Sequence, residues 1–186
     1  MATPSAPTAH CSAYIATSLD GFIARRDCSI DWLEAAQAGV PPGEDCGYAA
    51  YMAGIDAIVM GRNTFEKVQS FPSWPYTLPV YVLSRRWDAL PAGPPTSATL
   101  WRGDVAELAR HAAAQGHARL CIDGGLALQS FLAAGLLREI TVTRIPVLLG
   151  EGLPLFGPLP QGDVALQHLA TRTWDFGFVQ SHYRIG

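Results

Sequence analysis

The chain has 186 residues, of which 49% are hydrophobic and 16% are charged. This composition argues against a disordered chain and suits one domain with a substantial core. The formal net charge of −3 argues against general nucleic-acid binding, which requires a basic excess. No apolar run reaches the roughly 18 residues that suggest a membrane span, so we expect neither nucleic acid nor a membrane as a partner.

The cysteines and histidines give no sign of a metal site. The four cysteines are scattered, without a Cys-x-x-Cys pair, and the five histidines form no ligand motif, so we expect reduced thiols, a cytoplasmic protein and no metal. Residues 1–9 are predicted to form a disordered tail. Residues 10–186 show no break in composition and are predicted to form a single domain.

The first quarter of the chain is predicted to contain two strands and two helices. A strand is expected at residues 10–17, with a short continuation at 22–24 after an Asp-Gly turn. Helices are expected at 31–36 and 45–53. On the second helix, Tyr48 is expected to share a buried face with the residues three and four positions further on.

The prediction of the fold depends most on a segment in the middle of the chain. The apolar run 55–60 ends at Gly61, as in a central parallel strand buried on both faces. A helical pattern then begins at Phe65. Further strands are predicted at 79–83 and 98–102.

The last third is predicted to begin with helices and to end with strands. An alanine-rich helix at 105–115 is opened by Asp104, a good N-cap residue, and a helix at 126–134 follows a strand at 120–122. The final strands are predicted at residues 139–149, 163–171 and 178–185. Together these elements predict an α/β fold: a central, mostly parallel sheet flanked by helices, with an antiparallel C-terminal hairpin.

Three predicted strands end in small residues or donors that suit phosphate groups: Gly61, Arg62 and Thr64; Ser84 and Arg85; Gly124 and Gly125. Open α/β sheets bind ligands at the carboxyl ends of their strands, and helix N-termini attract anions. A ligand that reaches all three ends must be long and carry several anionic groups, as a dinucleotide does. Two arginines at neighbouring strand ends, Arg62 and Arg85, suit the additional 2′-phosphate of NADP and therefore favour NADP over NAD. The Gly-x-Gly-x-x-Gly fingerprint is absent, and a simple turn with a solvated arginine at Gly61-Arg62 remains the alternative.

These segments also resemble a known family. Met60-Gly-Arg-Asn-Thr-Phe-Glu66 is similar to the Met-Gly-Arg-x-Thr-aromatic-Glu motif of the dihydrofolate-reductase-like superfamily, and residues 18–24 resemble its first strand and loop. The segments 123–125, 135–140 and 146–156 resemble one branch, the reductase domain of the bifunctional riboflavin-biosynthesis deaminase-reductase and its stand-alone bacterial relatives.

This resemblance implies a dihydrofolate reductase-like fold, NADPH as cofactor and a homodimer. It assigns the cofactor to the following residues: Ala16 and Ile23 beside the nicotinamide; Gly61, Arg62 and Thr64 at the adenosine-side phosphates; Ser84 and Arg85 at the 2′-phosphate; Gly124, Gly125 and Leu126 at the pyrophosphate. It also implies a cis peptide bond between Gly124 and Gly125, a conformation that occurs mainly where function requires it.

The sequence identifies the substrate and the proton donor less clearly than it identifies the cofactor. Glu44 and Asp45 fall near the catalytic carboxylate of dihydrofolate reductases, although a helix N-cap and a first-turn acid are the simpler interpretation. Asp31 is the other candidate acid, because Asp31 and Trp32 resemble residues near the substrate in riboflavin-type relatives; a capping acid and a packed aromatic are the alternatives. Tyr48 is a candidate stacking surface. Asp123 could face the substrate or brace the glycine turn.

The prediction is therefore an NADPH-dependent reductase that transfers a hydride to a small heteroaromatic compound, similar to 5-amino-6-(5-phosphoribosylamino)uracil reductase. The zinc deaminase half of the bifunctional enzyme is missing, because no His-x-Glu occurs with Cys-x-x-Cys. Alternatives are dihydrofolate reductase itself and a non-catalytic, dimeric NADP(H)-binding protein. The predicted strand 139–149 could pair or pack across a two-fold axis, or be buried within one chain.

Overall fold

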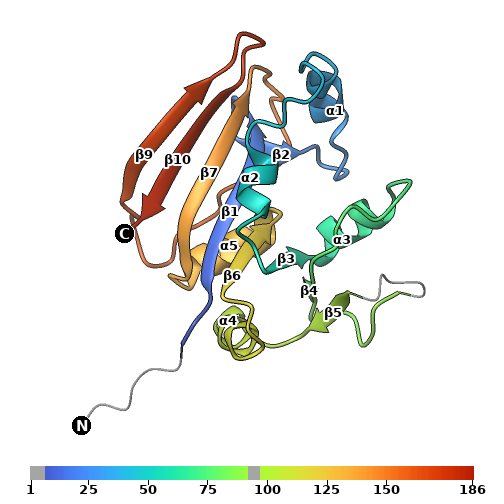
Figure 1. The fold of residues 1–186 in the computed structure, drawn as a ribbon, viewed down its shortest axis with the longest axis vertical. Coiled ribbons are helices and arrows are strands. Elements are labelled where there is room, and N and C mark those ends of the chain that lie inside the picture. Colours follow the sequence, from blue (N-terminus) through green and yellow to red (C-terminus); the bar gives the residue numbers. More distant parts are fainter. Residues whose placement is uncertain (1–6, 92–96) are drawn as a thin grey trace.

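The computed structural model describes residues 7–91 and 97–186. Its main sheet has eight strands in the order β5-β4-β3-β6-β1-β7-β10-β9 (Figure 1). Their bounds are β1 (His10–Ser18), β3 (Ala57–Gly61), β4 (Val80–Leu83), β5 (Ala98–Trp101), β6 (Arg119–Asp123), β7 (Leu137–Ile145), β9 (Leu166–Thr173) and β10 (Val179–Ile185). Pairing is parallel from β5 to β7 and antiparallel from β7 to β9. The predicted fold class is confirmed.

The remaining elements are two short strands and five helices in the described part of the chain. β2 (Phe22–Ala24) and β8 (Leu153–Pro154) pair with each other in a small second sheet. The helices are α1 (Asp31–Gln37), α2 (Tyr48–Met52), α3 (Arg62–Gln69), α4 (Val105–Ala114) and α5 (Gly125–Ala133). Within residues 7–91 and 97–186, no helix combines the length and the apolar character needed to cross a bilayer.

The alternation of side chains along β3 explains why helices cover both faces of the sheet. Ala57 and Val59 point into a core shared with α4 and α5, whereas Ile58 and Met60 point into a second core with Phe65 of α3. All four β3 side chains are at most 1% exposed. The predicted burial of this strand on both faces is therefore confirmed.

The carboxyl-terminal part of β1 separates from β6, and this separation positions the site. β1 pairs with β6 only at His10, Cys11 and Ser12, but it pairs with β7 as far as Ser18. Beyond Cys121, β6 therefore has no β1 partner on that side. The connections between strands also change direction at this position: β3 leads to β4 on one side, whereas β6 leads to β7 on the other side of β1. Open α/β sheets bind ligands at such a position.

The helix boundaries differ from the predictions at two places. α3 begins at Arg62, three residues earlier than predicted, so Arg62 and Thr64 lie in its first turn. α2 begins only at Tyr48, because Asp45 and Gly47 form the turn that caps it. The predicted buried face of this helix is wrong for Tyr48, which is 39% exposed because it borders a cavity.

The predictions for β7 and for the N-terminal tail also need correction. β7 ends at Ile145, since Pro146 cannot donate a ladder hydrogen bond. Both edges of β7 are paired within this chain, to β1 and β10, so it does not pair across a two-fold axis. The predicted tail fails at Ala9, which is buried and donates its N–H to Ala109 O at 3.1 Å, while residues 1–6 of that tail lie outside the described residues.

Candidate active site

The sheet brings the three predicted phosphate-binding strand ends together. β4, β3 and β6 are neighbours and run in parallel, with Gly61 opposite Leu83 and Met60 opposite Asp123. The residues after each strand therefore meet at one edge of the sheet. Two of these strand ends lead directly into helices, α3 and α5, whose first N–H groups lack helical partners and favour anions.

Gly124 makes the turn from β6 into α5. Its φ of 83° lies in the left-handed region, and a Cβ atom on it would overlap the hydroxyl of Thr64. No cis peptide bond occurs among the described residues, so the expected cis bond between Gly124 and Gly125 is wrong. The positive φ of Gly124, which only glycine adopts readily, turns the chain instead.

Gly125 is enclosed by protein. A Cβ atom on it would lie 2.8 Å from Ile23 Cδ1 and 3.2 Å from the Pro154 carbonyl oxygen. The missing side chain at Gly125 therefore allows the small β2–β8 sheet to pack against α5. Leu126, the next residue, is 69% exposed and lies at the surface in the first turn of α5.

The two predicted phosphate-binding arginines differ in their surroundings. Arg62 is half-buried, with its Nη1 atom 3.3 Å from Glu66 Oε1 and its guanidinium group 6.0 Å from the centre of the Trp87 ring. Arg85 is exposed. Ser84, the residue before Arg85, is 9% exposed, and its hydroxyl accepts the backbone N–H groups of Arg86 at 3.3 Å and Trp87 at 3.2 Å.

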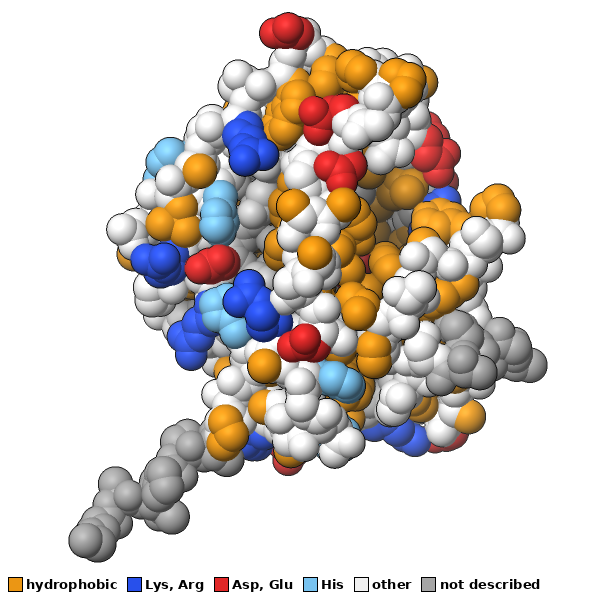
Figure 2. Space-filling model, viewed as in Figure 1, with side chains coloured by type: hydrophobic (Ala, Val, Ile, Leu, Met, Phe, Trp, Pro, Cys, Tyr) orange, Lys and Arg blue, Asp and Glu red, His pale blue; other side chains and the backbone are white. Residues whose placement is uncertain are grey.

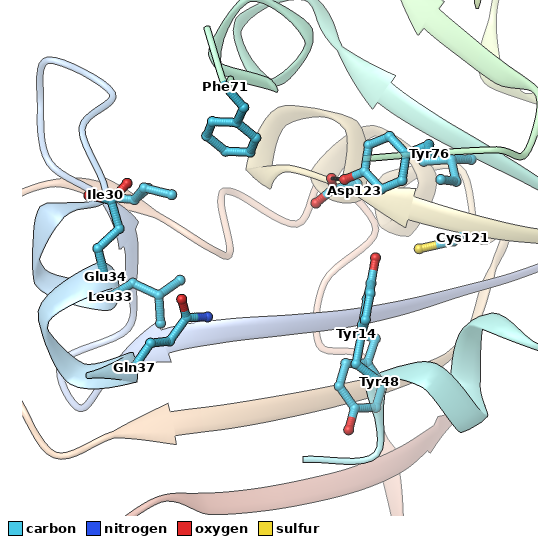
Figure 3. Close-up of a pocket in the computed structure, with 11 residues that line it drawn as sticks. Tyr14, Ile30, Leu33, Glu34, Gln37, Tyr48, Phe71, Tyr76, Cys121 and Asp123 are labelled. Carbon is cyan, nitrogen blue, oxygen red and sulfur yellow. Dashed lines mark hydrogen bonds between the residues drawn. The ribbon is translucent and has the colours of Figure 1, made fainter. Parts of the chain in front are cut away.

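A cavity of about 460 Å³ lies between α1, β1 and β6. Figure 2 shows the hollow between the α1 and α3 sides of the molecule, with apolar side chains around it. Its lining is aromatic and polar: Tyr14, Ile30, Leu33, Glu34, Gln37, Tyr48, Ile58, Phe71, Tyr76, Cys121 and Asp123 (Figure 3). Such a lining suits a planar compound that carries a few polar groups.

Asp123, the last residue of β6, brings a carboxyl group to this cavity. Tyr76 donates its hydroxyl hydrogen to Asp123 Oδ2 at 3.4 Å. Burial raises the pKa of Asp123 above its ordinary value, although the backbone N–H of Gly124 acts in the opposite direction. Asp123 can therefore hold a proton at a pH where an exposed aspartic acid has lost it.

The neighbours of Asp123 are also held in their protonated forms. Burial, followed by the nearby Cys121 and Asp123, raises the pKa of Tyr48 to about 12. Burial likewise raises the pKa of Tyr76 and raises the pKa of Cys121 to about 12. The cavity therefore presents two tyrosine hydroxyl donors beside one buried carboxyl group.

A second cavity, of about 350 Å³, adjoins the first and shares Tyr14 and Tyr48 as a wall. The Tyr14 hydroxyl donates to the Cys46 carbonyl oxygen. Gln180 on β10 donates from Nε2 to Tyr14 Oη at 2.7 Å and to Thr143 Oγ1 at 2.9 Å. These bonds fix the ring of Tyr14 between the cavities.

The structure separates the predicted substrate residues into two groups. Tyr48 and Asp123 line the first cavity together. Asp31 does not line either cavity, because its carboxylate is 60% exposed and pairs with Arg25 Nε at 2.6 Å. Trp32 is 5% exposed and packs in a core with Ile145 and Phe178, so it does not line a cavity either.

Asp45 and Ala16 both border the second cavity. The Asp45 carboxylate accepts the N–H groups of Gly47 at 2.8 Å and Ala49 at 2.7 Å, so it caps α2. The structure therefore offers neither Asp31 nor Asp45 as a free proton donor, and Asp123 has the more suitable surroundings.

Several lining residues were missed by the sequence predictions. Cys121 could have been found with Asp123, because the two are two positions apart on one strand and share a face. Glu34 and Gln37 could have been found in the same way, because residues three positions apart lie on the same face of a helix. Tyr14 and Tyr76 gave no such signal, since only the folded chain brings them to Asp123.

The strand order, the strand ends that meet at one edge of the sheet and the cavity beside β6 define a dihydrofolate reductase-like α/β protein. The sequence profile of the RibD C-terminal domain family matches residues 10–179. The chain therefore belongs to the RibD C-terminal domain family, as the sequence resemblance predicted.

Relatives of the chain agree with this assignment. YwjB of Bacillus subtilis strain 168 is 36% identical over 175 residues, which are 91% of this chain and 94% of YwjB. A crystal structure from Shewanella sp. PV-4, provisionally described as a riboflavin biosynthesis protein, is 36% identical, covers 95% of this chain and 99% of its own, and has a TM-score of 0.88.

Dihydrofolate reductase from Enterococcus faecalis, solved with NADP(H), has the same fold. It is 16% identical to this chain, with a TM-score of 0.63 and coverage of 97% of this chain and 98% of its own. At this identity, the similarity shows the fold alone.

Proposed function

We propose that this protein is an NADPH-dependent reductase that transfers a hydride to a small heteroaromatic compound. The observation that carries the proposal is that the edge of the sheet where β3, β4 and β6 end adjoins the cavity. Asp123 lines the cavity, and Gly124, the next residue, forms the turn from β6 into α5. A cofactor at this edge and a substrate in the cavity would therefore meet at the end of β6.

The residues at the ends of β3, β4 and β6 suit a dinucleotide with several phosphate groups. Arg62 and the first turn of α3 would hold the adenosine-side phosphates, and Ser84 with Arg85 would hold the 2′-phosphate that distinguishes NADPH from NADH. Gly124 and Leu126 would face the pyrophosphate at the start of α5. The NADP(H) complex of the Enterococcus faecalis enzyme, which has the same fold, supports NADPH as the cofactor.

The bound cofactor would supply the hydride, and the protein would orient the substrate and provide a proton. Tyr14 and Tyr48 offer aromatic faces for a flat ring, while Phe71 and Leu33 add apolar surface to the lining of the cavity. Asp123 would hold the proton for the reduced ring, because burial favours its protonated form. In this proposal Asp123 takes the role that the sequence gave to Asp31 and Asp45.

Calorimetric titration of the purified protein with NADPH and with NADH tests the cofactor. Tight binding of NADPH, with at least about tenfold weaker binding of NADH, is expected. NADPH oxidation is then followed at 340 nm with pyrimidines, pterins, flavins and quinones as acceptors. A folded protein that gives no heat with NADPH would refute the proposal.

We also propose a cytoplasmic homodimer, from the resemblance to the family. Cys11, Cys28, Cys46 and Cys121 are free thiols, which suits a reducing compartment. Light scattering after size-exclusion chromatography measures the mass in solution. A mass equal to that of one chain, at concentrations of tens of micromolar, would contradict the dimer.

A further inference from the structure

Tyr76 makes a hydrogen bond to the proposed proton donor. Its hydroxyl group donates to Asp123 Oδ2 over 3.4 Å (Figure 3). A hydroxyl–carboxylate bond is normally about 2.5–2.7 Å long, so this contact can shorten when negative charge develops on the carboxyl group. Because Oδ2 accepts the hydrogen bond, the proton of the neutral acid belongs on the other oxygen, Oδ1. Tyr76 therefore fixes which oxygen carries the transferable proton.

Packed aromatic rings and prolines fix the position of Tyr76. The centre of its ring lies 5.5 Å from that of Trp74, which lies 5.6 Å from that of the fully buried Phe65 on α3. The Trp74 indole N–H has no hydrogen-bond partner among the described residues, so Trp74 supports Tyr76 through the packing of its ring. The segment 70–79, which carries Tyr76, also contains three prolines that restrict its backbone. The Tyr76 hydroxyl group is therefore held in a fixed place.

Most titratable groups around Asp123 are uncharged at neutral pH. Those that line the same cavity are Tyr14, Glu34, Tyr48, Tyr76 and Cys121, with Tyr51 behind Cys121. Burial raises the pKa of all four tyrosines and of Cys121, to about 12 for Tyr48 and Cys121. Glu34 is on α1, across the cavity from Asp123 (Figure 3), and its Oε1 atom is 4.0 Å from Lys67 Nζ. Negative charge on Asp123 is therefore stabilised mainly by the donors that touch it, the Tyr76 hydroxyl and the Gly124 N–H group.

Proton donation leaves a buried carboxylate. In the proposed reaction a ring carbon of the substrate takes the hydride, and a neighbouring ring atom takes the proton from Asp123 Oδ1. The electron pair of the broken O–H bond stays on the carboxyl group. Burial disfavours this negative charge, whereas hydrogen bonds to the charged form favour it. A donor whose bond strengthens as the charge develops therefore lowers the barrier to proton transfer.

We propose that Tyr76 is a positioning residue for this proton transfer. The proposal rests on the proposed function and adds a residue to it. The Tyr76 hydroxyl group keeps the transferable proton on Asp123 Oδ1 and stabilises the carboxylate that remains on Asp123. Phenylalanine at this position would keep the ring contacts with Trp74 but would lose both effects.

The titration of Asp123 tests this role in the full chain without cofactor or substrate. In isotope-labelled protein, the carboxyl carbon resonance of Asp123 is assigned from the backbone, confirmed by its loss in Asp123→Asn and followed by NMR as the pH is raised. Tyr76→Phe removes the donor, so the acid dissociation constant of Asp123 should fall at least about threefold. Tyr81→Phe is the matched control, because Tyr81 lies in the core beneath α4, where its hydroxyl group is 2.9 Å from His117 Nδ1. It should leave the titration unchanged.

Trp74→Leu supplies a second variant. It keeps the Tyr76 hydroxyl group but removes the ring that supports it, so it should shift the titration in the same direction by a smaller factor. If Tyr76→Phe does not fold, Trp74→Leu decides the outcome.

A pH profile separates positioning from general packing. With an acceptor found in the NADPH oxidation screen, Tyr76→Phe should lower kcat at least about tenfold and leave the KM for NADPH within about twofold. Because Asp123 must be protonated to donate, activity falls as the pH rises through its pKa. This fall should occur at higher pH in Tyr76→Phe, whereas a purely structural role would scale the profile without moving it.

The inference is overturned if Tyr76→Phe leaves the titration of Asp123 unchanged, if Tyr81→Phe shifts it as much, or if the pH profile of Tyr76→Phe is lowered without moving. Titration of Asp123 in the ordinary range of an exposed aspartic acid in the parent protein would also overturn it. A failed NADPH titration would instead refute the proposed function, while the cofactor-free NMR titration still decides whether Tyr76 stabilises the Asp123 carboxylate.

Discussion

The hydroxyl of Thr64 lies against Gly124, on the side where any other residue would carry its Cβ atom. Thr64 belongs to the first turn of α3 and Gly124 to the start of α5. This contact holds the ends of β3 and β6 together. The family motif around Thr64 and the glycine pair are therefore coupled by packing.

Gly124→Ala should lower both stability and NADPH affinity. The variant has to adopt a positive φ of 83° and also overlaps Thr64. Gly116→Ala is the control, because Gly116 has a φ of 86° but open space around it, so it shows the backbone cost alone, roughly 1 kcal/mol. Urea unfolding should show a distinctly larger loss for Gly124→Ala, and Thr64→Ala in the same chain should recover part of it. Equal losses for the two alanine variants would contradict the contact.

Arg85→Ala should distinguish the two nicotinamide cofactors. Only NADPH carries the 2′-phosphate, and a hydrogen bond to a charged group contributes about 1.5–3 kcal/mol, so NADPH affinity should fall at least about tenfold while NADH affinity changes little. Arg86→Ala, at the exposed neighbouring position, should affect neither. Calorimetry gives all the affinities. Equal losses of NADPH and NADH in Arg85→Ala would remove Arg85 from the 2′-phosphate site.

Asp123→Asn should change how stability depends on pH. Burial raises the folded-state pKa of Asp123 above 3.8, so between the unfolded and the folded pKa the folded chain binds more protons. Folding stability relative to Asp123→Asn is therefore greatest below the unfolded pKa and decreases as the pH rises through the folded pKa. Urea unfolding of both proteins at several pH values from 4 to 8 measures the difference. A difference independent of pH would show that Asp123 does not retain its proton on folding.

Gln180→Leu should destabilise the protein and weaken substrate binding. Gln180 is 7% exposed and donates to both Tyr14 and Thr143. Losing these bonds inside the protein should cost about 1–3 kcal/mol and release the ring of Tyr14. Gln167→Leu on the exposed strand β9 is the control, and its unfolding free energy should change by less than about 0.5 kcal/mol. Similar effects of the two substitutions would argue against the positioning role of Gln180.

The sequence by itself determined the eight strands of the main sheet, the five helices and the edge of the sheet where the candidate site lies. The apolar run before Gly61 requires burial on both faces, and Asp104 caps α4 by accepting the Glu107 N–H at 2.7 Å, as its residue type predicted. These features depend on neighbouring residues in the chain. Local periodicity and capping chemistry are sufficient to predict them.

Only the tertiary structure decided which side chains line the cavity. Asp31 and Trp32 are neighbours of Leu33 on α1, but the orientation of that helix directs Leu33 to the cavity, Asp31 to Arg25 and Trp32 to the core. Tyr76 reaches Asp123 from 47 residues away. A contact of this kind depends on how β1 separates from β6 and on how the loops pack beside the gap between these strands. A local sequence pattern does not predict that arrangement.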